Sequence, residues 1–178
     1  MNYAAWSYDL TSKLLHWMMA ILLIGLVGLG WYMGSIPDKP DRGWYIGIHK
    51  SFGIIAGVLI LLRIIWRLSH KSASLPNSIP LWQAKLSGFI HFLLYVCMIL
   101  MPLSGFLGSS FGKYGVAFFG WQIPDWVVKN KEISKQLFEI HDITTWVLVA
   151  LVTLHILAAL KHIFINKNGV MRRMWFNS

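Results

Sequence analysis

Four long apolar stretches constrain the fold of this chain more than any other feature of its sequence. They run from about residue 14 to 33, 44 to 66, 86 to 109 and 137 to 165. Each is long enough to cross a hydrocarbon core about 30 Å thick, which takes about 20 helical residues. Because a chain in lipid must satisfy its own backbone hydrogen bonds, each stretch is expected to be helical. The sequence therefore predicts an all-α, integral membrane four-helix transmembrane bundle that forms a single membrane domain over residues 1–178.

The balance of apolar and charged residues agrees with this prediction. Hydrophobic residues make up 56% of the chain and charged residues only 13%, and its ten tryptophans favour a membrane–water interface. The net charge of +9 would also be compatible with nucleic-acid binding. However, the basic residues cluster in the connections between apolar stretches, where they face lipid headgroups. We therefore expect contact with membrane lipid and no nucleic-acid partner.

The first apolar stretch is interpreted as a retained helix rather than a cleaved signal peptide. Its apolar run is too long for a signal peptide, and an acidic residue, Asp9, lies in the short leader before it. The stretch also does not end in a small-x-small cleavage site.

The distribution of charge predicts the orientation in the membrane. The connection between the first two stretches has no basic excess, with Asp38, Lys39, Asp41 and Arg42. The next connection and the C-terminal tail are basic, with Arg67, Lys71, Lys85, Lys167, Arg172 and Arg173. Because basic connections stay on the cytoplasmic side, both termini are predicted to be cytoplasmic.

The longest connection, about residues 110 to 136, is then periplasmic. It contains Trp121, Pro124, Asp125 and Trp126, followed by a mixed-charge run from Lys129 to Glu139. A length of roughly 25 residues favours a partly ordered cap, with room for a short amphipathic helix.

Histidines are the most informative polar residues. Six of the seven lie in or at the ends of the apolar stretches: His16, His49, His91, His141, His155 and His162. Polar groups inside a membrane are costly, so a set of this size points to a function. The fourteen residues between His141 and His155 correspond to about 21 Å and nearly four helical turns, which places both on one helix face at two depths. At the cytoplasmic level His16 can meet His155, and at the outer level His49 can meet His141.

Two histidine pairs drawn from different helices are the layout expected for two bis-histidine haems. Cys97 is the only cysteine and there is no Cys-x-x-Cys-His motif, so any haem would be held without covalent attachment. Two axial histidines fill the coordination sphere of the iron, so such a haem would pass electrons rather than bind oxygen. A zinc site would gather its ligands more closely and add Cys or carboxylate. A proton or ion pathway and purely structural histidines remain open alternatives.

Arg63 lies fourteen residues after His49, hence on the same helix face at the cytoplasmic level. A buried arginine needs an anion, which a haem propionate would supply. The alternative is that Arg63 extends to the cytoplasmic interface together with Arg67.

An ordered set of short motifs resembles the bacterial cytochrome b561 family over nearly the whole chain. The first two apolar stretches contribute Lys13-Leu14-Leu15-His16-Trp17, Ile48-His49-Lys50 and Arg63. The third carries an H-x3-Y-x6-P-x2-G pattern, formed by His91, Tyr95, Pro102 and Gly105. The fourth contributes His141, Leu154-His155 and Leu160-Lys161-His162.

The resemblance implies a multi-pass protein of the bacterial inner (cytoplasmic) membrane with two non-covalent b haems. Its axial ligands would be His16 with His155 and His49 with His141, the same pairing that depth alone predicts. Family members exchange electrons with the quinone pool. Some are described as superoxide oxidases, which take an electron from superoxide at the outer face and reduce ubiquinone.

His91 and His162 also fall on positions where family members carry histidine. His162 lies seven residues beyond His155, about 10 Å closer to the cytoplasm, where a quinone headgroup would need a hydrogen-bonding or protonating group. The alternative for His162 is an interfacial histidine that faces headgroups. His91 is expected either beside the haem or as a partnered core histidine. Pro102 with Gly105 is expected to bend the third helix and to leave room for a porphyrin edge, or to allow ordinary close helix packing.

Three functions follow from these expectations. The first is a di-haem cytochrome that carries electrons between a periplasmic donor, either superoxide or a redox protein, and ubiquinone. A basic patch at the outer face, with Lys50, Lys113 and Lys129 to Lys135, would draw in an anion, although Asp125, Glu132 and Glu139 dilute it. The second is a haem-bearing membrane anchor subunit of a larger dehydrogenase. The third is a cofactor-free proton or ion transporter, which would usually carry more intramembrane carboxylates than Asp142 alone.

Overall fold

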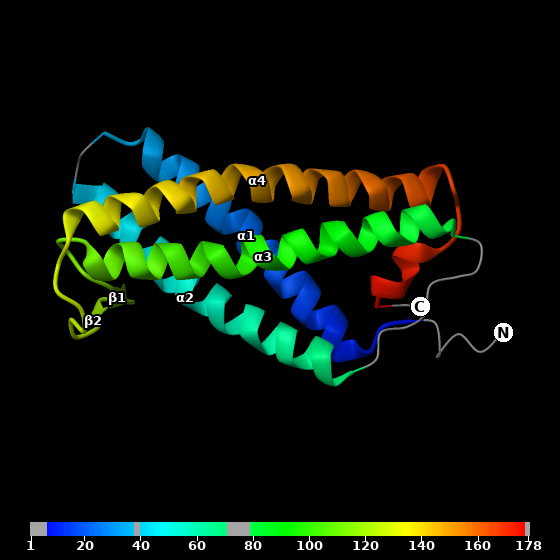
Figure 1. Cartoon of the computed structure of the whole chain (residues 1–178), viewed down its shortest axis with the longest axis horizontal. Helices are drawn as coiled ribbons and strands as arrows, with labels where there is room; N and C mark the ends of the chain where they lie inside the picture. Colours follow the sequence, from blue (N-terminus) through cyan, green and yellow to red (C-terminus); the bar gives the residue numbers. More distant parts are fainter. Residues whose placement is uncertain (1–6, 38–39, 71–78, 177–178) are drawn as a thin grey trace.

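Four long helices form the molecule in the computed structural model, which describes residues 7–37, 40–70 and 79–176. They are α1 (Leu10–Ser35), α2 (Pro40–Ser69), α3 (Leu81–Phe111) and α4 (Lys131–Phe164), and they pack into one elongated bundle (Figure 1). All four are long and apolar enough to cross a bilayer. The predicted four-helix transmembrane bundle is confirmed.

Each helix begins earlier than its apolar stretch predicted, and α1 and α4 begin with turns that are capped by a side chain. The Asp9 carboxylate accepts a hydrogen bond from the Ser12 amide at the start of α1. At the start of α4, the side chain of Asn130 accepts bonds from the amides of Glu132 and Ile133. Residues 131–136, predicted as part of the cap, therefore belong to α4. Such N-caps satisfy backbone amides that hydropathy does not detect.

The connection between α3 and α4 contains a small β-hairpin, so the expectation of a short amphipathic helix there was wrong. Strands β1 (Ala117–Phe118) and β2 (Trp121–Gln122) pair antiparallel. The two residues between them, Phe119 and Gly120, have φ of 46° and 88°. Positive φ at both central residues belongs to the two-residue turns that connect tight hairpins, and it is incompatible with a helix.

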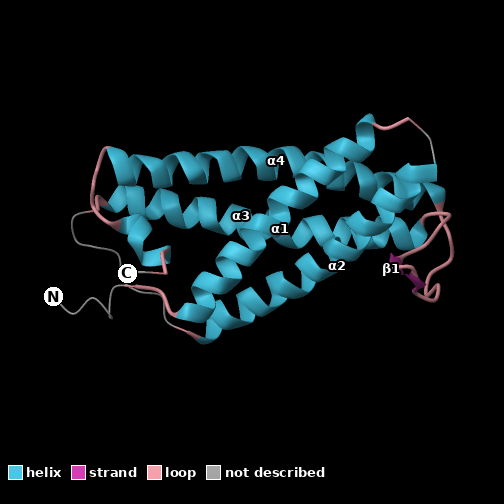
Figure 2. Cartoon of the chain, turned by 180° about the vertical axis from the view of Figure 1, so that it is seen from behind, coloured by secondary structure: helices cyan, strands magenta, loops and turns pink. Residues whose placement is uncertain are grey.

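The two ends of the bundle differ, and we name them after what they carry. The hairpin end holds β1 and β2, and the terminal end holds the described N-terminal residues and the 3₁₀-helix η2 (Val170–Met174) (Figures 1 and 2). At the terminal end the Tyr8 amide donates to the Arg173 carbonyl at 3.1 Å. The indole of Trp17 donates to the Met174 carbonyl at 2.9 Å, so the two ends of the chain meet. Asp38, Lys39 and Lys71, which entered the charge argument, lie outside the described residues.

Helix α1 crosses the bundle obliquely, whereas α3 and α4 run side by side along their lengths (Figures 1 and 2). A buried apolar cluster joins α3 and α4 through Leu94, Cys97, Leu148 and Leu151. Many large apolar side chains instead face outward, among them Ile21, Leu61, Phe89 and Trp146. An apolar exterior of this extent suits a hydrocarbon environment and would be unfavourable in water.

Candidate functional site

Two histidines from different helices face each other toward the hairpin end. His49 in α2 and His141 in α4 have ring centroids 6.3 Å apart, with the ring planes at 75°. We call these two residues the hairpin pair.

A second pair lies toward the terminal end. The ring centroids of His16 in α1 and His155 in α4 are 6.2 Å apart, at 62°. These two residues are the terminal pair. With metal–nitrogen bonds of about 2 Å, two imidazoles on opposite sides of one iron have centroids about 6 Å apart. The centroid distances of both pairs are therefore compatible with a bis-histidine haem, and the structure brings together the same partners that the sequence paired.

The polar surroundings of the hairpin pair leave its nitrogens suited to metal binding. Nδ1 of His141 donates to the Met101 carbonyl oxygen at 2.9 Å, with the Ser104 hydroxyl 3.2 Å away. When the proton is held on Nδ1, Nε2 carries the free electron pair, and this arrangement is common in metal-bound histidine. Nδ1 of His49 is buried and has no hydrogen-bond partner among the described residues. A buried orphan nitrogen is unfavourable without a ligand.

Two glycines border the rings of the hairpin pair. A Cβ atom on Gly105 of α3 would lie 3.1 Å from the His141 ring, and one on Gly30 of α1 would lie 3.6 Å from the His49 ring. Gly105, the glycine of the third-helix motif, thus leaves space for the His141 ring and does not serve close helix packing alone. Pro102 lies inside α3 and packs against Gly57 of α2, whose added Cβ would be 3.3 Å from the proline ring. These residues fit a flat cofactor beside the pair.

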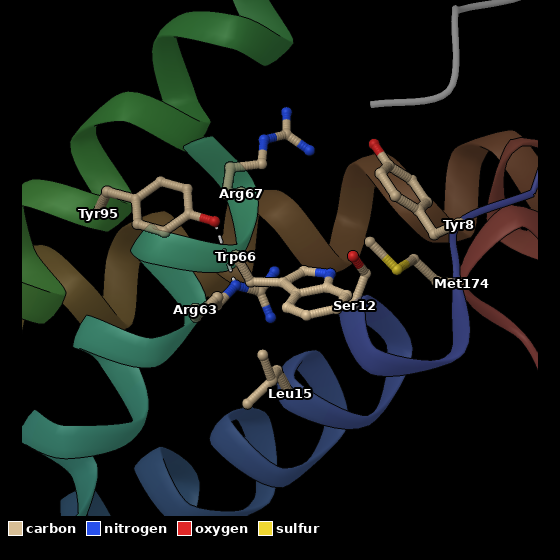
Figure 3. A pocket seen from close by; sticks show the side chains of 8 residues that line it. All are labelled: Tyr8, Ser12, Leu15, Arg63, Trp66, Arg67, Tyr95 and Met174. Atoms are coloured by element: carbon tan, nitrogen blue, oxygen red, sulfur yellow. Dashed lines mark hydrogen bonds between the residues drawn. The ribbon is translucent and has the colours of Figure 1, made fainter. Parts of the chain in front are cut away.

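Arg63 points into the bundle at the terminal end rather than to the membrane surface (Figure 3). Its Nε donates to the Tyr95 hydroxyl at 3.2 Å and its Nη2 donates to Nδ1 of His16 at 3.1 Å. Nη1 is buried with no partner among the described residues. By contrast, Arg67 is exposed, with its guanidinium 6.0 Å from the Tyr8 ring. Arg63 is the buried cation that an acidic group of a ligand would satisfy.

The bond between Arg63 and His16 fixes a proton position. Arginine only donates, so Nδ1 of His16 accepts and the proton of a neutral His16 is on Nε2. Coordination through Nε2 requires that proton on Nδ1 instead. A metal at Nε2 of His16 therefore requires Arg63 to release the ring and turn to another acceptor.

A small cavity opens between Arg63 and the terminal end of the chain (Figure 3). Its lining combines both arginines with aromatic and polar side chains: Tyr8, Ser12, Leu15, Arg63, Trp66, Arg67, Tyr95 and Met174. Tyr95 was given no role from the sequence. The sequence did contain one signal for a role of Tyr95: it lies one helical turn after His91 in α3, and residues four apart share a helix face.

The two remaining predicted histidines have different surroundings. His91 lies beside the terminal pair, with its ring centroid 5.3 Å from that of His155 and Ser87 Oγ 3.4 Å from its Nδ1. His162 lies in the last turn of α4, where Asn168 donates to its Nδ1 at 2.9 Å. Asn168 follows the apolar stretch and had no recognisable signal in the sequence.

The four helices are long and apolar on the outside, and two pairs of histidines face each other between them. These features define a multi-pass membrane protein with sites suited to a metal cofactor. Residues 7–177 match the prokaryotic cytochrome b561 family. The Escherichia coli protein named cytochrome b561 homolog 2 is 30% identical over 94% of this chain and 90% of its own length. A probable superoxide oxidase CybB of Yersinia pestis is 25% identical, over 90% of both chains. A probable Ni/Fe-hydrogenase B-type cytochrome subunit of Rhizobium leguminosarum is 20% identical over 94% of this chain and 85% of its own length.

The chain belongs to the prokaryotic cytochrome b561 family. It is accordingly a membrane protein of a family that binds b-type haem and transfers electrons.

Proposed function

We propose that this chain carries two b haems and moves electrons between a periplasmic donor and ubiquinone in the bacterial inner membrane. The observation that carries the proposal is the presence of two cross-helix histidine pairs, each with centroids slightly over 6 Å apart, at two levels of α4. In this proposal both termini are cytoplasmic, as the positive connections predict, and the hairpin end faces the periplasm.

The residues divide into two haem sites. His49 and His141 would hold the haem toward the periplasm, and His16 and His155 would hold the haem toward the cytoplasm. When bound, the haems supply reversible one-electron transfer. The Met101 carbonyl orients the His141 ring, and Arg63, with its buried Nη1, would supply positive charge to a propionate of the cytoplasmic haem.

His162 is the proposed proton donor to a quinone oxygen at the cytoplasmic end. Because Nδ1 of His162 accepts from Asn168, the proton of the neutral ring is on Nε2, which is then the donor. Reduction of ubiquinone to ubiquinol takes two electrons and two protons, so a proton-carrying group near its oxygen is required. His91 is assigned a place beside the cytoplasmic haem, because its ring contacts that of His155.

Superoxide is the proposed small donor, since the Yersinia pestis relative is named a probable superoxide oxidase. Superoxide would lose one electron at the periplasmic side and leave as dioxygen. Two of the lysines expected to attract it are already engaged, since Lys50 donates to the Gly115 carbonyl and Lys129 pairs with Asp125. Lys113 and Lys131 are both exposed, so they are the candidates for steering an anion.

The alternative function is a membrane anchor subunit of a larger dehydrogenase, with a redox protein in place of superoxide. It is favoured by the likeness to the hydrogenase cytochrome subunit of Rhizobium leguminosarum, of which this chain covers 85%. In that case the hairpin end would contact a protein partner.

The test uses purified chain in vesicles that contain ubiquinone, with a superoxide-generating system outside. The proposal expects haem reduction followed by ubiquinol formation, both abolished by superoxide dismutase. Haem that is reduced by dithionite but never by superoxide would refute the self-contained function and support the anchor subunit. A protein that binds no haem would refute both and leave the transporter.

A further inference from the structure

Three successive residues of α2 fasten the hairpin connection to the helix directly after His49. Nζ of Lys50 donates to the Gly115 carbonyl at 2.9 Å. The Phe119 amide donates to the Ser51 hydroxyl oxygen at 2.8 Å. The rings of Phe52 and Phe119 meet edge to face with centroids 5.6 Å apart. The hairpin is thus docked on the helix turn that carries a proposed haem ligand.

Ser51 is the least accessible of these three contacts, with a side chain that is 0% exposed. Its hydroxyl donates to the Gly47 carbonyl at 2.8 Å and accepts from the Phe119 amide at the same distance. Both hydrogen-bonding roles of the hydroxyl are therefore filled. Phe119 has φ of 46°, which is uncommon for a residue with a Cβ, so a specific bond to its amide helps to hold that conformation.

The two rings of the hairpin pair differ in how they are oriented. His141 is held by its own bond to the Met101 carbonyl. His49 has no such bond, since its Nδ1 is without a partner among the described residues. The direction of the His49 ring therefore depends on the position of the α2 backbone, and the hairpin connection contacts the three residues that follow His49.

We propose that Ser51 is a positioning residue for His49. Its hydroxyl holds the hairpin on α2, and through this lock it sets the orientation in which the His49 ring would bind a haem. The role of His49 rests on the proposed function, whereas the lock itself does not.

The test compares Ser51→Ala with Ser69→Ala. Ser69 makes the same bond to the carbonyl four residues earlier, from its Oγ to Ile65 at 2.7 Å, but lies at the terminal end of α2 away from the hairpin. The pair of variants therefore separates the loss of the Phe119 bond from the loss of a helix-internal bond. Hydrogen exchange of the peptide that contains Phe119, and the low-spin electron paramagnetic resonance of each haem, are measured on the intact protein.

In Ser51→Ala, exchange at Phe119 is expected to accelerate by about tenfold, as for loss of one buried hydrogen bond. In the same variant, the ferric electron paramagnetic resonance signal of one haem is expected to shift, while that of the other haem stays unchanged. Ser69→Ala is expected to behave like the unsubstituted protein in both measurements. If the Phe119 amide exchanges without protection in the unsubstituted protein, Ser51 does not hold the hairpin on α2. Faster exchange with an unaltered haem signal would overturn the positioning role. A His49→Leu variant that keeps both haems would refute the ligand assignment instead.

Discussion

Nδ1 of His141 in α4 donates to the carbonyl oxygen of Met101 in α3 at 2.9 Å. Since this bond uses the proton of the neutral ring, Nε2 of His141 carries the free electron pair, and the ring centroid of His49 lies 6.3 Å from that of His141. The contact ties a ring on α4 to the backbone of α3, so the orientation of the His141 ring depends on how these two helices pack.

Leucine substitutions should separate the four proposed ligands into two groups. His49→Leu and His141→Leu should each lower haem content from about two to about one per chain, because a bis-histidine haem loses half of its axial ligation. The double variant should lose no more than either single variant. His16→Leu and His155→Leu should remove the other haem. Reduced-minus-oxidised spectra with haem quantification measure this, and a double variant with about zero haem would show that the pairing is wrong.

Arg63→Leu should lower the midpoint potential of the haem at the terminal pair. A buried positive charge disfavours the ferric state, so its removal should shift that potential down by tens of millivolts, on the order of the electrostatic effects seen at haem sites. Tyr95→Phe removes only the hydroxyl that accepts from Arg63 and should shift the potential less. Spectroelectrochemical titration resolves both haems. An upward shift in Arg63→Leu would contradict the assigned role.

Gly105→Ala should disturb the haem at the hairpin pair. Its new Cβ would lie 3.1 Å from the His141 ring, tighter than ordinary contact, so the ring must move. Gly25→Ala is the matched control, because a Cβ there meets nothing within 4 Å. We expect weaker haem retention only in Gly105→Ala. Equal haem content in both variants would show that the glycine serves ordinary packing.

Asp9 should make the stability of the terminal end dependent on acid pH. Burial raises the pKa of Asp9, but hydrogen bonds from Ser12 and from the Trp66 indole outweigh it and hold the pKa below 3.8. Because the pKa is lower in the folded chain, the stabilisation is present above the unfolded pKa and is lost as pH falls through the folded value. Asp9→Asn keeps a capping side chain and should flatten this dependence in thermal unfolding between about pH 5 and 3. If Asp9→Asn unfolds with the same pH dependence as the unsubstituted protein, Asp9 does not cause that dependence.

The bundle could be predicted because its cause is local. Apolar stretches of about 20 residues allow few other structures, and the fourteen-residue spacing on α4 placed His141 and His155 without any tertiary information. Arg63 was also placed at the right level, but its two possible directions could not be distinguished. Only the position of Tyr95 and His16 relative to it decides between them.

The hairpin could not be predicted, because it depends on contacts between distant residues. Phe119 takes its conformation from a turn with Gly120 and from Ser51, which is 68 positions earlier in the chain. The partner of His162 is equally hidden, since Asn168 reaches it only after α4 has ended. Periodicity and composition report on single segments and carry no signal for such bonds.

Whether each histidine pair holds a haem is measured by haem quantification on the detergent-purified chain, together with oxidised and dithionite-reduced visible spectra. We expect sharp reduced α and β bands of low-spin b haem and about two haems per polypeptide, one for each histidine pair. About one haem per chain would show that one of the two pairs is not a haem site. A protein that stays colourless after haem-supplemented expression would contradict the account.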